Sequence, residues 1–386
     1  MTGGAGSGSG SAPVSGKMRR IPHNRTLAIL AVSALAILVL LEATRRVWPD
    51  PLRKEKDAAI LLAQRAAEAV RKEKLRLGIP VDRHLDANGT GLIGVEYTDI
   101  TTTVGSLAAK RTSIHPAFAA VVVDMLDRAG ARRGDPVAIG FSGSFPALNI
   151  AVLSAARVLG LRPVIISSVG SSMYGANQPE MTWLDMERVL AESGILPYRS
   201  IAASLGGIAD ARGGLDGTGI DAALGAIRRN GIPRIEEGGK SALAADVRKR
   251  MELYDRALDG RRPAAFVNVG GSLTSVGDGP ESHRIPTGLL EKVPAVRHPE
   301  RGVIFRMGER GVPVIHLLEI RSIAARYGIP ADPAATARGV PATPPLSGRY
   351  SPPVAAAGLA LLIALLAILG KADPKRMGAG SRPAPD

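Results

Sequence analysis

The stretch PVAIGFSGSFPALNIAVLSAARVLG, residues 136–160, is the clearest guide to the fold of this chain. Val137 to Phe141 is an apolar run with the length of a buried strand, and Pro146 to Leu159 has the length of a helix. Gly160 follows where a helix commonly ends. Between the two runs lies the small-residue turn 142–144. A strand, a turn and a helix in this order offer hydroxyls and backbone N–H groups to a polar or anionic ligand.

The same pattern occurs twice more. Strands are predicted at 162–168 and 264–269, and Gly/Ser turns follow at 170–172 and 270–272. Pro136 and Arg162 are 26 residues apart, the spacing of a strand–helix–strand crossover between parallel strands. The sequence therefore predicts an α/β layered domain with a largely parallel sheet, and it predicts that the turns converge at one edge of that sheet.

Polar and small residues around these turns suit a binding site without covalent chemistry. Arg can bind a carboxylate through two hydrogen bonds, and Lys supplies a point charge. The candidate ligand-binding residues are Thr101, Thr102, Thr103, Lys110, Arg111, Gly143, Ser171, Ser172, Asn177, Gly270, Gly271 and Ser272.

Nucleophilic catalysis is an alternative for the same turn. Residues 140–144, GFSGS, resemble the Gly-x-Ser-x-Gly elbow of hydrolases, with Ser in place of the last Gly. Ser142 and Ser144 are therefore candidate catalytic residues. A hydrolase also needs an acid and a base. Candidates for these are Asp210 or Asp216 with His283 or His298, and the spacing singles out no set.

We expect neither a cofactor nor a metal. The chain has no Gly-x-x-x-x-Gly-Lys-Ser/Thr motif and no dinucleotide fingerprint, and it has no cysteine for a zinc site. Neither the set Asp210, Asp216 and Asp221 nor the pair His283 and His298 has a recognised ligand spacing.

The net charge of +14 could indicate nucleic-acid binding, but the basic residues are scattered and aromatic residues make up only 3% of the chain. Lys and Arg instead gather beside the apolar ends of the chain. We therefore expect a membrane partner and no nucleic acid.

Two uncharged apolar runs predict two membrane-spanning helices, LAILAVSALAILVLL at 27–41 and VAAAGLALLIALLAILG at 354–370. Positive residues follow the second run at Lys371, Lys375 and Arg376. The positive-inside rule then places both termini in the cytoplasm and the domain outside the membrane.

The predicted organisation has seven parts. They are a disordered basic N-terminus at 1–25, a transmembrane helix at 26–44, a juxtamembrane helix at 45–78, the α/β domain at 79–330, a Pro/Ala-rich linker at 331–353, a transmembrane helix at 354–370 and a basic tail at 371–386. The helix at 52–77 is amphipathic and has two interpretations, a basic face near lipid headgroups or ordinary packing on the domain. Further strands are predicted at 92–96 and 312–318, and 276–300 is predicted to be a loop.

Three blocks of sequence together resemble the poly-γ-glutamate system protein family, whose members are bacterial and membrane-anchored. The blocks are EYTDITTTVGSLAAKRTSIHPAFAA at 96–120, GFSGSFPALNIAVLSAARVLGLRPVIISSVGSSMYGAN at 140–177 with PEMTWLDME at 179–187, and VIHLLEIRSIAARYGIP at 314–330. The resemblance extends over roughly residues 40 to 330 and implies a role beside the machinery that makes and exports this polymer. It brings no catalytic residues with it.

The expected function is an accessory, membrane-anchored protein of poly-γ-glutamate synthesis or export, for a capsule or a secreted polymer. It would bind the anionic polymer, or the synthase and export components, through its Gly/Ser turns. The alternative is a serine-dependent amide or ester hydrolase that trims or releases the polymer. A scaffold without a ligand is a third possibility.

Overall fold

The computed structural model describes residues 24–45, 50–207, 214–236, 238, 243–296, 298–332 and 351–371. The chain divides into two compact units, residues 1–49 with 348–386, and residues 50–347. Each unit is described by itself.

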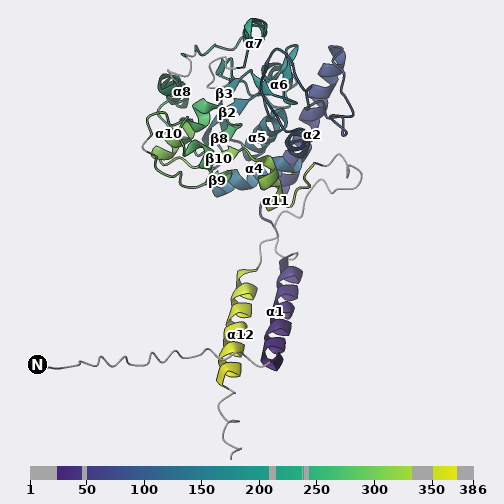
Figure 1. Cartoon of the computed structure of the whole chain (residues 1–386), viewed down its shortest axis with the longest axis vertical. Helices are drawn as coiled ribbons and strands as arrows, with labels where there is room; N and C mark the ends of the chain where they lie inside the picture. The colour runs from purple at the N-terminus through teal and green to yellow at the C-terminus, as the bar shows by residue number, and fades with distance from the viewer. Residues whose placement is uncertain are drawn as a thin grey trace, which may run out of the picture. The chain divides into compact units, whose positions relative to one another are not determined.

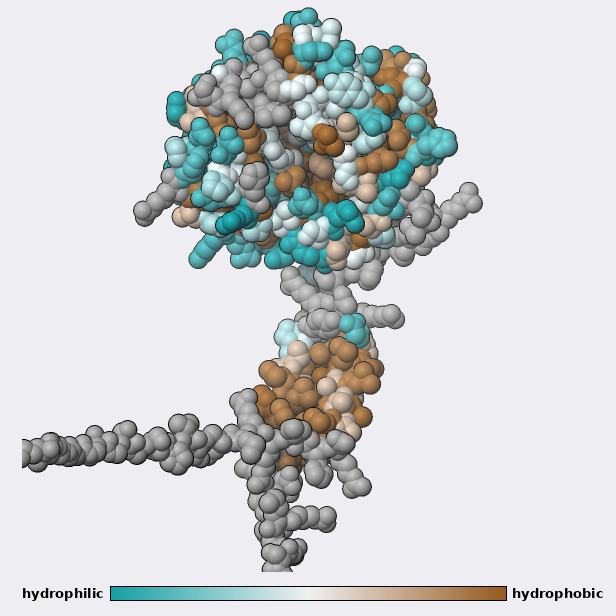
Figure 2. Space-filling model, viewed as in Figure 1, coloured by the Kyte–Doolittle hydropathy of each residue, from teal (hydrophilic) through white to brown (hydrophobic). Residues whose placement is uncertain are grey.

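The first unit contains two apolar helices, α1 (Asn24–Arg45) and α12 (Pro352–Lys371). Their segments Leu27–Thr44 and Pro352–Leu369 have mean hydropathies of 2.5 and 2.4 and are 0% and 6% buried. Figure 2 shows the apolar surface that they expose. The two predicted apolar helices are confirmed, and their length and composition fit a protein that crosses a membrane twice.

The second unit is built on a six-stranded sheet with the strand order β7-β3-β2-β8-β10-β9. Its strands are β2 (Pro136–Ser142), β3 (Arg162–Ser168), β7 (Ala202–Ser204), β8 (Phe266–Val269), β9 (Gly288–Leu290) and β10 (Val314–Leu317). All neighbouring strands pair in parallel except β9, which pairs antiparallel with β10 at one edge. The predicted α/β class and the largely parallel sheet are confirmed.

Alternate residues of each strand enter two separate hydrophobic cores. Ile139 and Phe141 lie in one core, whereas Ala138 lies in the other. Because side chains alternate across a strand, a sheet covered on both faces needs apolar residues at nearly every position. This requirement explains the unbroken apolar runs in the sequence.

Helices cover both faces of the sheet (Figure 1). The hydrophobic core on one face includes residues of α2 (Arg53–Arg76), α4 (Ala117–Arg128), α5 (Pro146–Leu159), α6 (Trp183–Glu192), α7 (Gly217–Arg229) and α11 (Ile320–Arg326). The core on the other face includes residues of α8 (Leu243–Leu258), α9 (Leu273–Val276) and α10 (Val303–Glu309). The helix predicted over Pro146–Leu159 has these bounds, and Gly160 ends it in the left-handed conformation with φ of 66°.

The amphipathic helix predicted at 52–77 packs on the domain. Ala59, Ala66 and Val70 of α2 are fully buried and belong to the same hydrophobic core as α4 and α5. Of the two interpretations of this helix, ordinary packing is therefore the one observed.

The strand predicted at 92–96 is wrong. Val95 is instead held by a side chain, because its N–H donates to Asn177 Oδ1 at 3.1 Å and its carbonyl accepts from Asn177 Nδ2 at 2.8 Å. Tyr174 N–H also donates to the Val95 carbonyl. The backbone groups that a strand neighbour would satisfy are thus paired by Asn177 and Tyr174, which are distant in the sequence. The prediction of a loop throughout 276–300 is also wrong, since β9 lies within it.

Two small pairings lie outside the main sheet. β1 (Thr101–Thr103) pairs in parallel with β4 (Ser171–Ser172), and β5 (Asn177–Gln178) pairs antiparallel with β6 (Met181–Thr182). The first pairing brings the threonine run beside the turn that follows β3.

Candidate functional site

A cavity of about 680 Å³ lies at the carboxyl end of the parallel strands. The turns after β2, β3 and β8 all contribute to it, as the topology predicts. Its lining includes nine of the predicted site residues, Thr102, Thr103, Lys110, Ser142, Ser144, Ser172, Gly270, Gly271 and Ser272.

Close backbone contact between two turns shapes this edge. A Cβ atom on Gly143 would lie 2.7 Å from the Val169 carbonyl oxygen, so only glycine fits there without a shift. Gly143 N–H donates to the Ser168 carbonyl at 3.1 Å, and the Gly143 carbonyl accepts from Ser171 Oγ at 3.1 Å. Gly143 therefore joins the turns and does not itself line the cavity.

The hydroxyls of Ser142 and Ser144 and the backbone N–H of Ser172 form a connected serine row across the two turns. Ser142 Oγ lies 3.0 Å from Ser144 Oγ, and it also accepts from Ser144 N–H at 3.1 Å. Ser144 Oγ accepts from Ser172 N–H at 3.0 Å. The row gives the cavity several polar groups that can exchange hydrogen bonds with a ligand.

Lys110 brings an amino group into this row from α3 (Leu107–Ser113), whose first turn is capped by the Ser106 hydroxyl. The residue is only 3% exposed, and its Nζ donates to Ser172 Oγ at 2.8 Å and to the Ser144 carbonyl. The Phe145 ring lies beneath the amino group, with its centroid 3.7 Å from Nζ. Burial lowers the pKa of Lys110 to about 7, because removing a cation from water disfavours it.

Arg111 does not reach the cavity, although it was predicted to act with Lys110. Its guanidinium donates to the carbonyls of His84 and Leu85 and forms an ion pair with Asp332 at 3.7 Å. Adjacent residues of a helix point in directions about 100° apart. The Lys-Arg pair is therefore divided between the cavity and the packing of a neighbouring loop.

Three other predicted ligand residues lie behind the cavity wall. Thr101 Oγ1 accepts from Asn177 Nδ2 at 3.0 Å, and Ser171 Oγ donates to backbone carbonyls. All three side chains are at most 3% exposed. They hold the turns in place and are not positioned to contact a ligand.

The structure adds a fourth turn to the site, after β10, which was not predicted from the sequence. Glu319 and Arg321 line the cavity there. Glu319 has φ of 49°, a left-handed conformation that is uncommon for a residue other than glycine. A signal was available, because the strand predicted at 312–318 also precedes a helix and so ends at the same edge.

Two of the four residues proposed as partners of a catalytic serine, Asp216 and His298, form hydrogen bonds elsewhere. Asp216 caps α7 by accepting from Gly219 N–H at 2.8 Å, and His298 Nδ1 accepts from Glu300 N–H. Asp210 lies outside the described residues. Of the described residues that line the cavity, none is a histidine. Catalysis by Ser142 or Ser144 stays a prediction.

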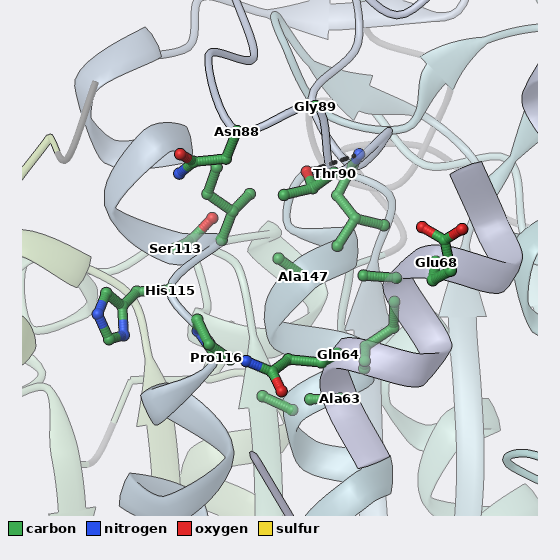
Figure 3. A pocket seen from close by; sticks show the side chains of 15 residues that line it. Ala63, Gln64, Glu68, Asn88, Gly89, Thr90, Ser113, His115, Pro116 and Ala147 are labelled. Atoms are coloured by element: carbon green, nitrogen blue, oxygen red, sulfur yellow. Dashed lines mark hydrogen bonds between the residues drawn. The ribbon is translucent and has the colours of Figure 1, made fainter. Parts of the chain in front are cut away.

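A second cavity, of about 360 Å³, lies between α2 and the segments around Thr90 and His115 (Figure 3). His115 Nδ1 accepts from Ala117 N–H at 3.2 Å, and the Thr90 hydroxyl donates to an Asp86 carboxylate. These polar groups hold the local backbone, and much of the remaining lining is Ala, Leu, Ile and Pro. The cavity at the sheet edge is therefore the better candidate site.

Fold and site together define an α/β protein with two apolar helices and a polar cavity at the carboxyl end of its sheet. No family model matches the chain, and no curated protein matches it. Among solved structures, the crystal structure of O-ureido-L-serine synthase is 15% identical, covering 61% of this chain and 76% of that one, with a TM-score of 0.16. At that TM-score the likeness carries no argument about this chain.

Proposed function

We propose that this protein is a membrane-anchored binding protein whose sheet-edge cavity takes an anionic ligand. The observation that carries the proposal is the convergence of four turns on one cavity that also contains Lys110 and Arg321. A lysine or arginine and several hydroxyls are the groups that recognise carboxylates.

The sequence resemblance supplies the biological context for this ligand. A γ-glutamyl chain carries a carboxylate on every residue, which suits a cavity lined by Arg321 and by Lys110 in its protonated form. We infer an accessory role in poly-γ-glutamate synthesis or export, in which the cavity binds a segment of the polymer. Cytoplasmic termini and an extracytoplasmic domain would place the cavity on the side to which the polymer is exported.

Binding of short γ-glutamyl oligomers to the full chain in detergent or nanodiscs tests the proposal. Titration calorimetry should show affinity that falls as salt is added, because the attraction is electrostatic. Lys110→Met should weaken binding about ten- to a hundredfold, in line with about 1.5–3 kcal/mol for a hydrogen bond to a charged group.

Arg111→Met is the matched control, since Arg111 is adjacent in sequence but faces away from the cavity. Its affinity should equal that of the unmodified chain. The proposal would be refuted if the affinity did not change with salt concentration, or if Lys110→Met and Arg111→Met weakened binding equally.

A further inference from the structure

Lys110 differs from the other buried lysines of this domain in having no carboxylate near it. Lys56 is 4% exposed, and its Nζ lies 2.9 Å from Asp50 and 3.2 Å from Asp124. Lys74 is 2% exposed, and the charge of Asp86 offsets part of its burial. Lys110 forms no ion pair with any described residue, and its two polar partners are uncharged.

A buried amino group without a counter-ion is disfavoured as a cation, which is consistent with the lowered pKa of Lys110. Near neutral pH, a large fraction of the side chain then carries a free lone pair on Nζ. A neutral amine in a desolvated pocket is the form of lysine that attacks carbonyl carbons.

We propose that Lys110 Nζ forms an imine with an aldehyde that binds in the sheet-edge cavity and carries an anionic group. The Nζ lone pair forms a bond to the carbonyl carbon, and the carbonyl π electrons move to oxygen to give a carbinolamine. The nitrogen loses its protons, the oxygen gains them and leaves as water, and a C=N bond remains. Aldehyde and amine are thus converted to imine and water with no oxidant or reductant.

Ser172 is placed to assist the proton transfers. Its hydroxyl lies 2.8 Å from Nζ. A hydroxyl can accept a proton from one group while donating to another. The Ser172 hydroxyl can therefore carry a proton from the nitrogen to the departing oxygen.

The size and lining of the cavity indicate what else the aldehyde carries. A volume of about 680 Å³ is within the range of sites for small molecules and cofactors. Arg321 lines the same cavity and forms no ion pair with a described residue. Its guanidinium suits a phosphate or a carboxylate.

Three aldehydes test the inference on the full chain in detergent. They are pyridoxal 5′-phosphate, pyridoxal without the phosphate, and glyoxylate, which carries a carboxylate. Borohydride reduces an imine to a stable secondary amine, which peptide mass spectrometry locates. We expect stoichiometric labelling of Lys110 at low reagent concentration, stronger with the anionic aldehydes than with pyridoxal, and a visible imine absorbance with the pyridoxal reagents. Whichever of pyridoxal 5′-phosphate and glyoxylate labels Lys110 more strongly shows whether the cavity prefers a phosphate or a carboxylate.

Lys110→Met and Lys110→Arg should reduce this labelling at least tenfold. The arginine variant keeps a cation in the cavity, so that loss of labelling is not a loss of charge. Lys74→Met is the control, because Lys74 is equally buried but does not line the cavity. Thermal unfolding of each variant confirms that it is folded. Ser172→Ala should slow labelling without abolishing it.

Labelling spread over exposed lysines, or unchanged in both Lys110 variants, would overturn the inference. So would tight binding of pyridoxal 5′-phosphate that borohydride does not make covalent. That last result would leave the cavity as an anion-binding site. Failure of the γ-glutamyl titration alone would instead reject the polymer as its ligand while leaving the imine intact.

Discussion

At the scale of single residues, burial has opposite consequences for the two kinds of ionisable group in this domain. Glu187 on α6 is fully buried, and its carboxylate accepts from Ser200 N–H and Ser200 Oγ, both at 2.8 Å. Arg199 Nε lies 3.7 Å away. Burial nevertheless raises the pKa of Glu187 to about 7, whereas it lowers that of Lys110. Glu187 does not line the cavity, so we expect its protonation to affect the stability of the domain and not ligand binding.

A raised carboxyl pKa predicts that stability falls as pH rises. The folded state binds the proton more tightly than the unfolded state, so the contribution of Glu187 is complete below the unfolded pKa near 4.5 and lost as pH rises through about 7. Between pH ~5 and ~9, this carboxyl should reduce the free energy of unfolding by about 2 kcal/mol.

Glu187→Gln, which is neutral and keeps an acceptor for Ser200, should remove this loss. Urea unfolding at several pH values measures it, with Glu252→Gln on the exposed face of α8 as a control that leaves the pH dependence unchanged. An equal pH dependence in Glu187→Gln and the unmodified chain would contradict the expectation.

At the scale of elements, the strand–turn–helix unit positions the site through backbone contacts. The turn after β2 packs against the turn after β3 so closely that Gly143 has no space for a side chain. α5 begins directly beyond this turn, and Asn149 on α5 donates to the Ser142 carbonyl at 3.0 Å. The serine row is therefore attached to two strands and a helix, which limits its movement.

Gly143→Ala should separate the two turns and weaken ligand binding. The added methyl group would meet the Val169 carbonyl at 2.7 Å, and overpacking of this kind costs about 1–3 kcal/mol. We expect a lower unfolding temperature together with loss of γ-glutamyl binding. The control is Gly225→Ala within α7, where a Cβ meets nothing within 4 Å. It should stabilise the chain by up to about 1 kcal/mol, because alanine favours a helix over glycine. Equal unfolding temperatures for the two variants would show that the close contact is unimportant.

At the scale of the whole molecule, two helices present almost entirely apolar surfaces, whereas the unit at 50–347 places its apolar residues in two cores. Within the first unit, α1 and α12 touch. A Cβ on Gly358 would lie 2.7 Å from Ile37 Cγ2, so the glycine permits a close approach of the helices. Small residues have this role in membrane helix pairs.

The charge distribution predicts which side of the membrane each part occupies. A fluorescent protein that folds only in the cytoplasm should be active when fused to the C-terminus. Alkaline phosphatase, which needs an oxidising compartment, should be active when inserted in the 331–350 region. Changing Lys371, Lys375 and Arg376 to neutral residues should reduce this bias, since positive residues retain a flank in the cytoplasm. The reverse pattern of activities would place the domain in the cytoplasm.

The sequence alone determined the features that depend on local chemistry. The unbroken apolar runs, the turn glycines and the uncharged end segments predicted the parallel sheet, the bounds of α5 and both apolar helices, because each is set by residues close in the chain. Parallel strands then implied that their turns meet. The sequence was less informative where a hydrogen-bond partner is distant in the chain. At Val95 the predicted strand does not form, because the side chain of Asn177 pairs with its backbone.

Only the tertiary structure decided which side chains of the converging turns face the cavity. Lys110 and Arg111 are adjacent basic residues that the sequence does not distinguish. In the structure the Lys110 amino group is buried beside Ser172, whereas the Arg111 side chain binds a neighbouring loop. Glu319 and Arg321 joined the site through β10. The direction of a side chain, and the desolvation that lowers the pKa of Lys110, depend on what packs around it in space. The strand–turn–helix at 136–160 therefore located the site, and the packing of the other turns around it selected the residues that can act there.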